Sequence, residues 1–216
     1  MTLETSDKVK IAYDWYPAEK PAGYLLLIHM MPATKDSWRG FAGEMQRAGY
    51  ASLAIDLRGH GESDGGPEGY KNFSDAEHQK SIWDLDAGVK FLIEQGAKPD
   101  RITLIGASIG ANLALWYLVE HPQIKCAVLL SAGENYRGIA AVPFAKKLSL
   151  GQRLLLIASR DDVRSGGDVA SFNEEFAKSV PAKAEAKLII YETGGHGTEL
   201  LGEATPEIKK FIVDLL

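Results

Sequence analysis

Short apolar runs recur along the chain and are separated by segments with a mixed polar and apolar pattern. Seven such runs are rich in Leu, Ile and Val, and most are apolar at consecutive positions rather than at alternate ones. Continuous apolar runs of this length are typical of strands that are covered on both faces. The predicted strands are Val9–Trp15, Tyr24–His29, Ala51–Asp56, Arg101–Gly106, Cys126–Ser131, Arg153–Ala158 and Lys187–Tyr191.

Amphipathic segments lie between several of these runs. Their apolar residues recur every third or fourth position, which is the spacing of one helix face. Ser74-Asp75-Ala76-Glu77 is a capping box, Thr205-Pro206-Glu207 predicts the start of the last helix, and Gly49 predicts the end of the first. The predicted helix faces are Trp38, Phe41, Met45 and Ala48; Ile82, Leu85, Val89 and Leu92; residues 109–120; and Ile208, Phe211, Ile212 and Leu215.

Strands that alternate with helices predict the α/β class, with a mostly parallel central sheet flanked by helices. We expect a single domain over residues 1–216, because no repeat, low-complexity tract or linker interrupts the pattern. The Gly-rich loop Arg58–Gly69 and the segment Gly133–Ser149 are the longest connections without a strong helix pattern. Long connections at the carboxyl edge of a parallel sheet are where ligands bind.

Charge and composition narrow the class of partner. The chain of 216 residues has a net charge of -5, and no basic stripe is present to bind nucleic acid. The apolar runs are too short to cross a bilayer, so we expect no membrane partner. Met1 to Lys10 is polar and lacks the apolar stretch of a secretory signal, which favours the cytoplasm.

Cysteine and histidine usage argues against a disulfide or a metal site. Cys126 is the one cysteine, and its apolar run predicts a buried structural thiol. The chain has neither a His-Glu-x-x-His helix nor a cysteine pair, so we expect no metal ion. Of the histidines, His78 and His121 are expected to be solvated.

The pentapeptide Gly106-Ala107-Ser108-Ile109-Gly110 carries the strongest chemical signal. It joins a predicted strand to a predicted helix, where Gly-x-Ser-x-Gly is the pattern of a nucleophile elbow. A side chain at either glycine would clash with the neighbouring strand or with the helix. The pattern therefore predicts a serine exposed on the tip of a sharp turn.

A serine hydroxyl needs a base that takes its proton and an acid that orients the base. Asp161 and Asp162 follow the predicted strand Arg153–Ala158, and His196 follows the last predicted strand. Gly195 and Gly197 flank the histidine and give its backbone freedom to approach the serine. Three loops at one sheet edge would thus supply a nucleophile, an acid and a base.

These motifs resemble those of the α/β-hydrolase superfamily over essentially the whole chain, and most of all the small, cap-poor bacterial esterases related to dienelactone hydrolase. His29 and the segment Asp56–Ser63 add to the resemblance. It implies little or no cap, with Ser108 as nucleophile, Asp162 as orienting acid and His196 as general base and acid. Asp161 is then expected to pair with Arg160 or to bond its own turn.

The resemblance also implies an oxyanion hole formed by two backbone N–H groups. One is that of Ile109, and the other comes from the loop after Tyr24–His29, where relatives have His-Gly-x. This chain has His29-Met30-Met31, so the Met31 N–H takes that role and Met30 replaces a glycine. Met30 cannot readily adopt a glycine-only conformation, so the sequence leaves open whether this loop keeps the geometry of the family.

Met30, Tyr136 and Phe144 are candidates for the pocket wall. Trp38 is expected in the core, and His29, His60 and Asp56 are expected to have structural roles. The sequence thus predicts a serine hydrolase that cleaves small or short-chain carboxylic esters through an acyl-enzyme and needs no cofactor. A thioesterase, lactonase or peptidase would use the same triad, and a non-catalytic ligand-binding protein that retains the fold is the alternative from a different class.

Overall fold

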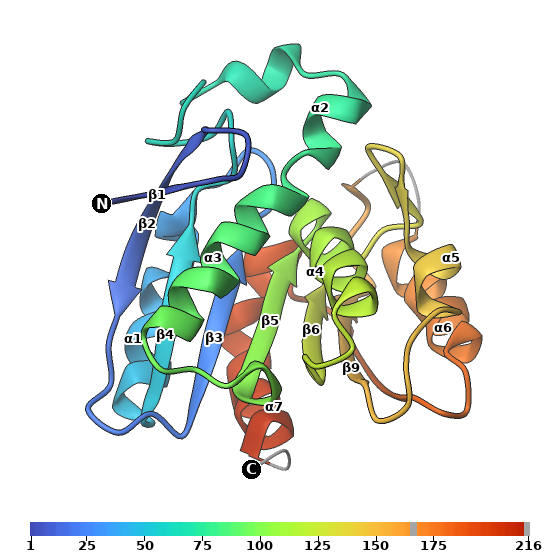
Figure 1. The fold of residues 1–216 in the computed structure, drawn as a ribbon. Helices are drawn as coiled ribbons and strands as arrows, with labels where there is room; N and C mark the ends of the chain where they lie inside the picture. The colour runs from blue at the N-terminus through green and yellow to red at the C-terminus, as the bar shows by residue number, and fades with distance from the viewer. Residues whose placement is uncertain (165–167, 214–216) are drawn as a thin grey trace.

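An eight-stranded sheet runs through the centre of the molecule, as seen in the computed structural model, which describes residues 1–164 and 168–213 (Figure 1). Its strands are β1 (Thr2–Glu4), β2 (Lys10–Tyr16), β3 (Gly23–Ile28), β4 (Tyr50–Ile55), β5 (Ile102–Ala107), β6 (Cys126–Leu130), β9 (Arg153–Ser159) and β10 (Glu185–Tyr191). The spatial order is β1-β2-β4-β3-β5-β6-β9-β10. The pairs β1–β2 and β2–β4 are antiparallel, and all later neighbours are parallel.

The predicted α/β architecture is confirmed, and all seven predicted runs form strands of this sheet. β1 was not predicted, because it has only three residues, two of them polar and exposed, and it pairs only at the edge of the sheet.

Helices cover both faces of the sheet, which explains the continuous apolar runs. α3 (Ile82–Glu94), α4 (Ile109–Glu120) and α6 (Val169–Ser179) lie on one face, and α1 (Arg39–Arg47) and α7 (Leu201–Val213) on the other (Figure 1). In β3, Leu26 and Ile28 join the core under α3 and α4, whereas Leu25 and Leu27 join the core under α1 and α7. Alternate side chains are therefore buried in opposite directions.

Most helix boundaries agree with the sequence pattern. α1 ends at Arg47, and Gly49 follows with a φ of +88°. The predicted capping box at Ser74 is present, although α2 (Asp75–Gln79) ends before α3 begins. α6 was not predicted.

The predicted start of the last helix at Thr205–Pro206 is wrong. α7 begins at Leu201 and contains Pro206. Leu200 and Ala204 are fully buried, so their burial favours a helical backbone here despite the proline. The carbonyl that loses its partner at Pro206 belongs to Gly202, which is exposed and can bond water instead.

Two long connections form a small cover at the carboxyl edge of the sheet. The first contains η2 (Gly69–Asn72) and α2, and the second contains the hairpin of β7 (Asn135–Tyr136) and β8 (Ile139–Ala140), followed by α5 (Ala141–Ala145). In the described part of the chain no larger insertion stands over the sheet, as expected for a protein with little cap.

The buried guanidinium of Arg58 anchors the first connection. It donates to Asp84 of α3 at 2.8 and 2.9 Å and to Asp7 at 2.7 Å.

Cys126 begins β6 near the centre of the sheet. Its side chain is buried, as predicted, and burial raises the pKa of the thiol to about 12. None of the helices among the described residues is both long enough and apolar enough to cross a membrane.

Candidate active site

Ser108 stands at the turn between β5 and α4. Its backbone has φ +54° and ψ -119°, a conformation that is rare and strained for a non-glycine residue. A Cβ on Gly106 would lie 2.1 Å from the carbonyl oxygen of Gly110, and one on Gly110 would lie 2.4 Å from that of Ile28. The turn therefore requires both glycines, for the reason that the sequence predicts. The Ser108 N–H donates to the carbonyl of Leu130 at 2.8 Å, which ties the turn to β6.

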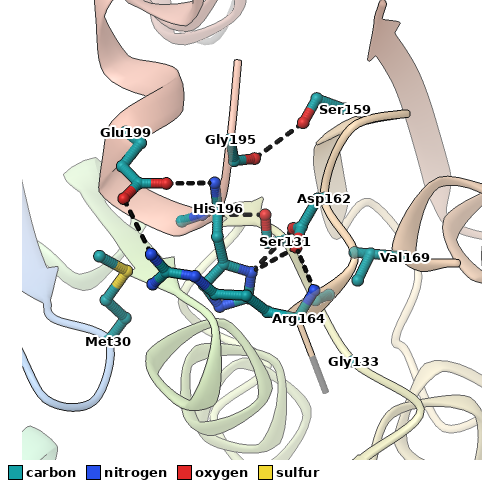
Figure 2. A network of polar contacts seen from close by, with 12 residues as sticks. Met30, Ser131, Gly133, Ser159, Asp162, Arg164, Val169, Gly195, His196 and Glu199 are labelled. Carbon is teal, nitrogen blue, oxygen red and sulfur yellow. Dashed lines mark hydrogen bonds and ion pairs between the residues drawn. The ribbon is translucent and has the colours of Figure 1, made fainter. Parts of the chain in front are cut away.

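A carboxylate and an imidazole meet beside this turn (Figure 2). The Nδ1 atom of His196 lies 2.8 and 3.0 Å from the two carboxylate oxygens of Asp162. Both side chains are buried, with exposed fractions of 2% for Asp162 and 3% for His196. The carboxylate fixes the proton on Nδ1, which leaves Nε2 as the bare, basic nitrogen.

The loop that carries His196 packs against the elbow. A Cβ on Gly197 would lie 3.4 Å from the Cβ of Ala107, so the residues next to His196 and Ser108 are in contact. Among the described residues, none forms a hydrogen bond with the Ser108 hydroxyl. The structure thus brings the three predicted residues to one sheet edge, and the Ser108–His196 proton transfer remains a prediction.

Side chains bind four successive backbone N–H groups of the histidine loop. The N–H groups of residues 194 and 195 donate to Asp161 at 3.3 and 3.0 Å, and that of His196 donates to Glu199 at 2.7 Å. The N–H of Gly197 donates to the Ser131 hydroxyl at 2.9 Å. The backbone around His196 is therefore fixed at every position from 194 to 197.

Asp161 does more than the sequence predicts. It accepts a hydrogen bond from the Ser159 hydroxyl at 2.7 Å, so it bonds its own turn as expected. Its bonds to the histidine loop were not expected, and the alternative partner, Arg160, pairs instead with Glu174 and Glu192.

Ser131 and Asn112 are two further residues that sequence reasoning missed. Ser131 is fully buried with φ +51° directly after β6, and the available signal was a polar residue at the end of the predicted strand Cys126–Ser131. The Asn112 amide nitrogen donates to the carbonyls of Gly133 and Ile139 at 2.8 and 2.7 Å. Asn112 thereby ties the β7–β8 hairpin to the first turn of α4, one turn beyond Ser108.

The loop after β3 packs against the histidine loop. Met30 is 8% exposed, and a Cβ on Gly197 would lie 2.5 Å from its sulfur, so Met30 lies under the backbone next to His196. Met30 is not among the non-glycine residues with positive φ in the described part of the chain. The expected difficulty of replacing a glycine is therefore absent. The N–H groups of Met31 and Ile109 donate to no described residue.

His29 fixes the start of that loop from inside the protein. Its Nε2 accepts from the Leu57 N–H at 2.9 Å, and its Nδ1 donates to the Met30 carbonyl at 2.9 Å. Burial lowers the pKa of His29 to about 3, so the ring is neutral at pH 7. The predicted structural role of His29 agrees with these contacts.

The two aromatic pocket candidates lie in different places. Tyr136 lies over Gly133, since a Cβ on that glycine would be 2.4 Å from its ring. Phe144 stacks on Trp116 with ring centroids 5.5 Å apart. Trp116 follows Ser108 by eight residues, which is ~12 Å along the helix axis, so Phe144 lies on the flank of α4 rather than at the elbow.

The remaining polar residues of the sequence motifs are structural. Asp56 is buried and accepts hydrogen bonds from the N–H groups of Lys35 and Glu62. His60 is buried and stacks on Tyr70. The expectation that His78 is solvated is wrong, because α2 turns this side chain inward and leaves it 2% exposed. The described residues contain no group of three side chains that could hold a metal ion.

Comparisons with known proteins identify the fold family of this chain. The sequence pattern described as the alpha/beta hydrolase fold matches residues 23–196, a span that includes Ser108, Asp162 and His196. The bifunctional esterase/perhydrolase DCH of Acinetobacter calcoaceticus is 31% identical over 133 residues, which cover 60% of this chain and 44% of the relative. The chain thus spans less than half the length of the curated relatives it matches.

Similar solved structures cover the whole chain at low identity. Est1E from Butyrivibrio proteoclasticus, solved with ferulic acid, aligns with 100% of this chain and 98% of its own, at 15% identity and a TM-score of 0.78. The Pyrococcus furiosus esterase Pf2001 aligns with 100% of this chain and 88% of its own, at 23% identity and a TM-score of 0.74. These likenesses concern the fold. Because the family pattern spans most of the sequence, this chain belongs to the alpha/beta hydrolase fold family.

Proposed function

We propose that this chain is a serine hydrolase that cleaves small or short-chain carboxylic esters through an acyl-enzyme on Ser108. The observation that carries the proposal is the buried Asp162–His196 pair. Its histidine belongs to a loop that packs against the turn bearing Ser108. The resemblance of its sequence motifs to those of the small esterases related to dienelactone hydrolase supports the proposal.

In the proposed mechanism, Nε2 of His196 takes the Ser108 proton while the serine oxygen attacks the ester carbonyl. Asp162 holds the imidazole in place and stabilises the imidazolium that forms. The oxyanion of the tetrahedral intermediate accepts hydrogen bonds from the N–H groups of Ile109 and Met31, which have no other described acceptor. His196 then protonates the leaving alkoxide, and water repeats the sequence on the acyl-enzyme without any cofactor.

The small cover over the sheet edge supports a small substrate. The β7–β8 hairpin and the loop after β3 bring Tyr136 and the two methionines to this edge, and no large insertion among residues 1–164 and 168–213 encloses an extended acyl chain. Esterases are also prominent among the similar structures. Thioesters, lactones and peptides would react by the same steps, so a panel of p-nitrophenyl esters with a thioester and a lactone identifies the preferred substrate.

Fluorophosphonate labelling tests the proposal. We expect one adduct on Ser108 in the wild-type protein and none in Ser108→Ala, whose turnover should fall by at least about 10³-fold because a triad member is lost. Ser171→Ala, an exposed serine of α6, is the matched control and should keep full labelling. A wild-type protein that neither labels nor hydrolyses any ester would instead be a non-catalytic ligand-binding protein.

A further inference from the structure

His196 is part of a closed ring of interactions, and two members of this ring, Arg164 and Glu199, lie outside the predicted triad (Figure 2). The ring runs from the imidazole to Asp162, and from the Asp162 carboxylate to the backbone N–H of Arg164, at 3.2 Å. The guanidinium of Arg164 donates to one carboxylate oxygen of Glu199 at 3.1 Å. The other oxygen of Glu199 accepts from the backbone N–H of His196 at 2.7 Å, which closes the ring.

Glu199 connects the two halves of this ring. It is the third residue after His196, in the short helix η5 (Gly197–Leu200), and it reaches back to the residue before that helix. A Cβ on Gly195 would lie 2.5 Å from the Glu199 carboxylate, and Gly195 has a φ of +70°. The glycine that precedes the histidine is therefore needed to admit Glu199.

The loop that bears Asp162 and the loop that bears His196 must keep a fixed separation for the imidazole to meet both Asp162 and Ser108. Arg164 belongs to the first loop and Glu199 to the second, so their ion pair joins the two loops. We propose that Glu199 is a positioning residue for His196 and that Arg164 and Glu199 form a clasp that holds the acid loop against the histidine loop. This inference rests on the proposed function of Ser108.

The clasp contributes through geometry rather than through stability. Arg164 and Glu199 are about half exposed, and an exposed ion pair of this kind contributes little to the free energy of folding. A displacement of a catalytic group by about 1 Å, in contrast, can lower the turnover rate by on the order of 100-fold. Loss of the clasp should therefore lower kcat while the protein stays folded and KM stays near its wild-type value.

Three variants separate the two contacts of Glu199. Glu199→Leu removes both contacts and should lower kcat for p-nitrophenyl acetate by on the order of tenfold or more. Glu199→Gln keeps an acceptor for the His196 N–H and should restore most of that loss. Arg164→Met removes only the ion pair and, like Glu199→Gln, keeps an acceptor for the His196 N–H, so its loss of kcat should be similarly small. The matched control is Glu174→Leu. This variant breaks the ion pair between Glu174 and Arg160, which is 3.2 Å long and about as exposed as the clasp, and it removes no contact of the ring.

A second readout keeps this test distinct from that of the proposed function. The proton NMR signal of the His196 Nδ1–H should broaden or shift upfield in Glu199→Leu and stay unchanged in Glu174→Leu, whether or not the protein hydrolyses esters. Wild-type kcat and an unchanged imidazole signal in Glu199→Leu would overturn the clasp. A change confined to KM in Glu199→Leu would also overturn it, and so would a loss of kcat in Glu174→Leu as large as that in Glu199→Leu. Failure of Ser108 labelling with an altered imidazole signal would overturn only the hydrolase proposal.

Discussion

His29 should make the protein sensitive to mild acid, and His29→Gln should remove part of that sensitivity. The ring is fully buried between the loops after β3 and β4. Its neutral form donates from Nδ1 to a carbonyl and accepts at Nε2 from an N–H. A protonated ring would direct a second N–H at the Leu57 N–H. A glutamine can donate and accept in the same way but does not titrate between pH 7 and 3.

The size of the effect follows from the pKa of His29, which burial lowers from 6.5 to about 3. Between these two values the unfolded chain binds a proton that the folded protein does not, so acid favours unfolding. One proton changes the free energy of unfolding by about 1.4 kcal/mol per pH unit. Between pH 7 and pH 5, His29 should therefore remove about 2 kcal/mol of stability.

Urea unfolding followed by circular dichroism at pH 7 and at pH 5 measures this difference. The loss of stability between the two pH values should be about 2 kcal/mol smaller in His29→Gln than in the wild type, whatever the variant costs at pH 7. Leu104→Ala, a buried core position without a titratable group, controls for destabilisation alone and should keep the wild-type pH dependence. Equal pH dependence in His29→Gln and wild type would refute the reasoning.

Two further results are expected. Asp162→Asn should lower kcat by roughly 10³- to 10⁴-fold, because the imidazole loses the carboxylate that fixes its proton, whereas Asp161→Asn should lower kcat about tenfold by loosening the histidine loop. Steady-state kinetics measure both values, and the reverse order would make Asp161 the acid. Gly110→Ala should lower the free energy of unfolding by ~3 kcal/mol, because the new Cβ would lie 2.4 Å from a β3 carbonyl. Gly40→Ala in α1 has open space around it and should be neutral or stabilising, so similar urea midpoints for the two variants would contradict the clash.

The sequence predicts the sheet well because its central strands, β3, β4, β5, β6 and β9, are buried on both faces, so their apolar runs are continuous and easily recognised. It predicts the helices less well. α6 has a mixed composition with several charged residues, and the start of α7 depends on Leu200 and Ala204 being buried, which is a tertiary contact. Local start signals such as Thr205–Pro206 do not contain that information.

The candidate site, like the fold, could be predicted only in part from the sequence. Ser108, Asp162 and His196 follow strand ends in a recognisable order, so their meeting at one edge could be predicted. The acceptors of the histidine loop could not be assigned, because Ser131, Asp161 and Glu199 bind backbone N–H groups, and a residue pattern does not show which N–H group a polar side chain will bind. The burial of His78 depends on how α2 turns and is likewise not local.

The burial of Cys126 makes this thiol a built-in reporter of chain opening. With its pKa raised to about 12 and its side chain inside the central sheet, it offers almost no thiolate to reagents in the folded protein. A thiol-specific dye would modify it only in molecules whose sheet has come apart. The modification rate therefore measures how often the core itself opens, separately from the movements of the loops around Ser108.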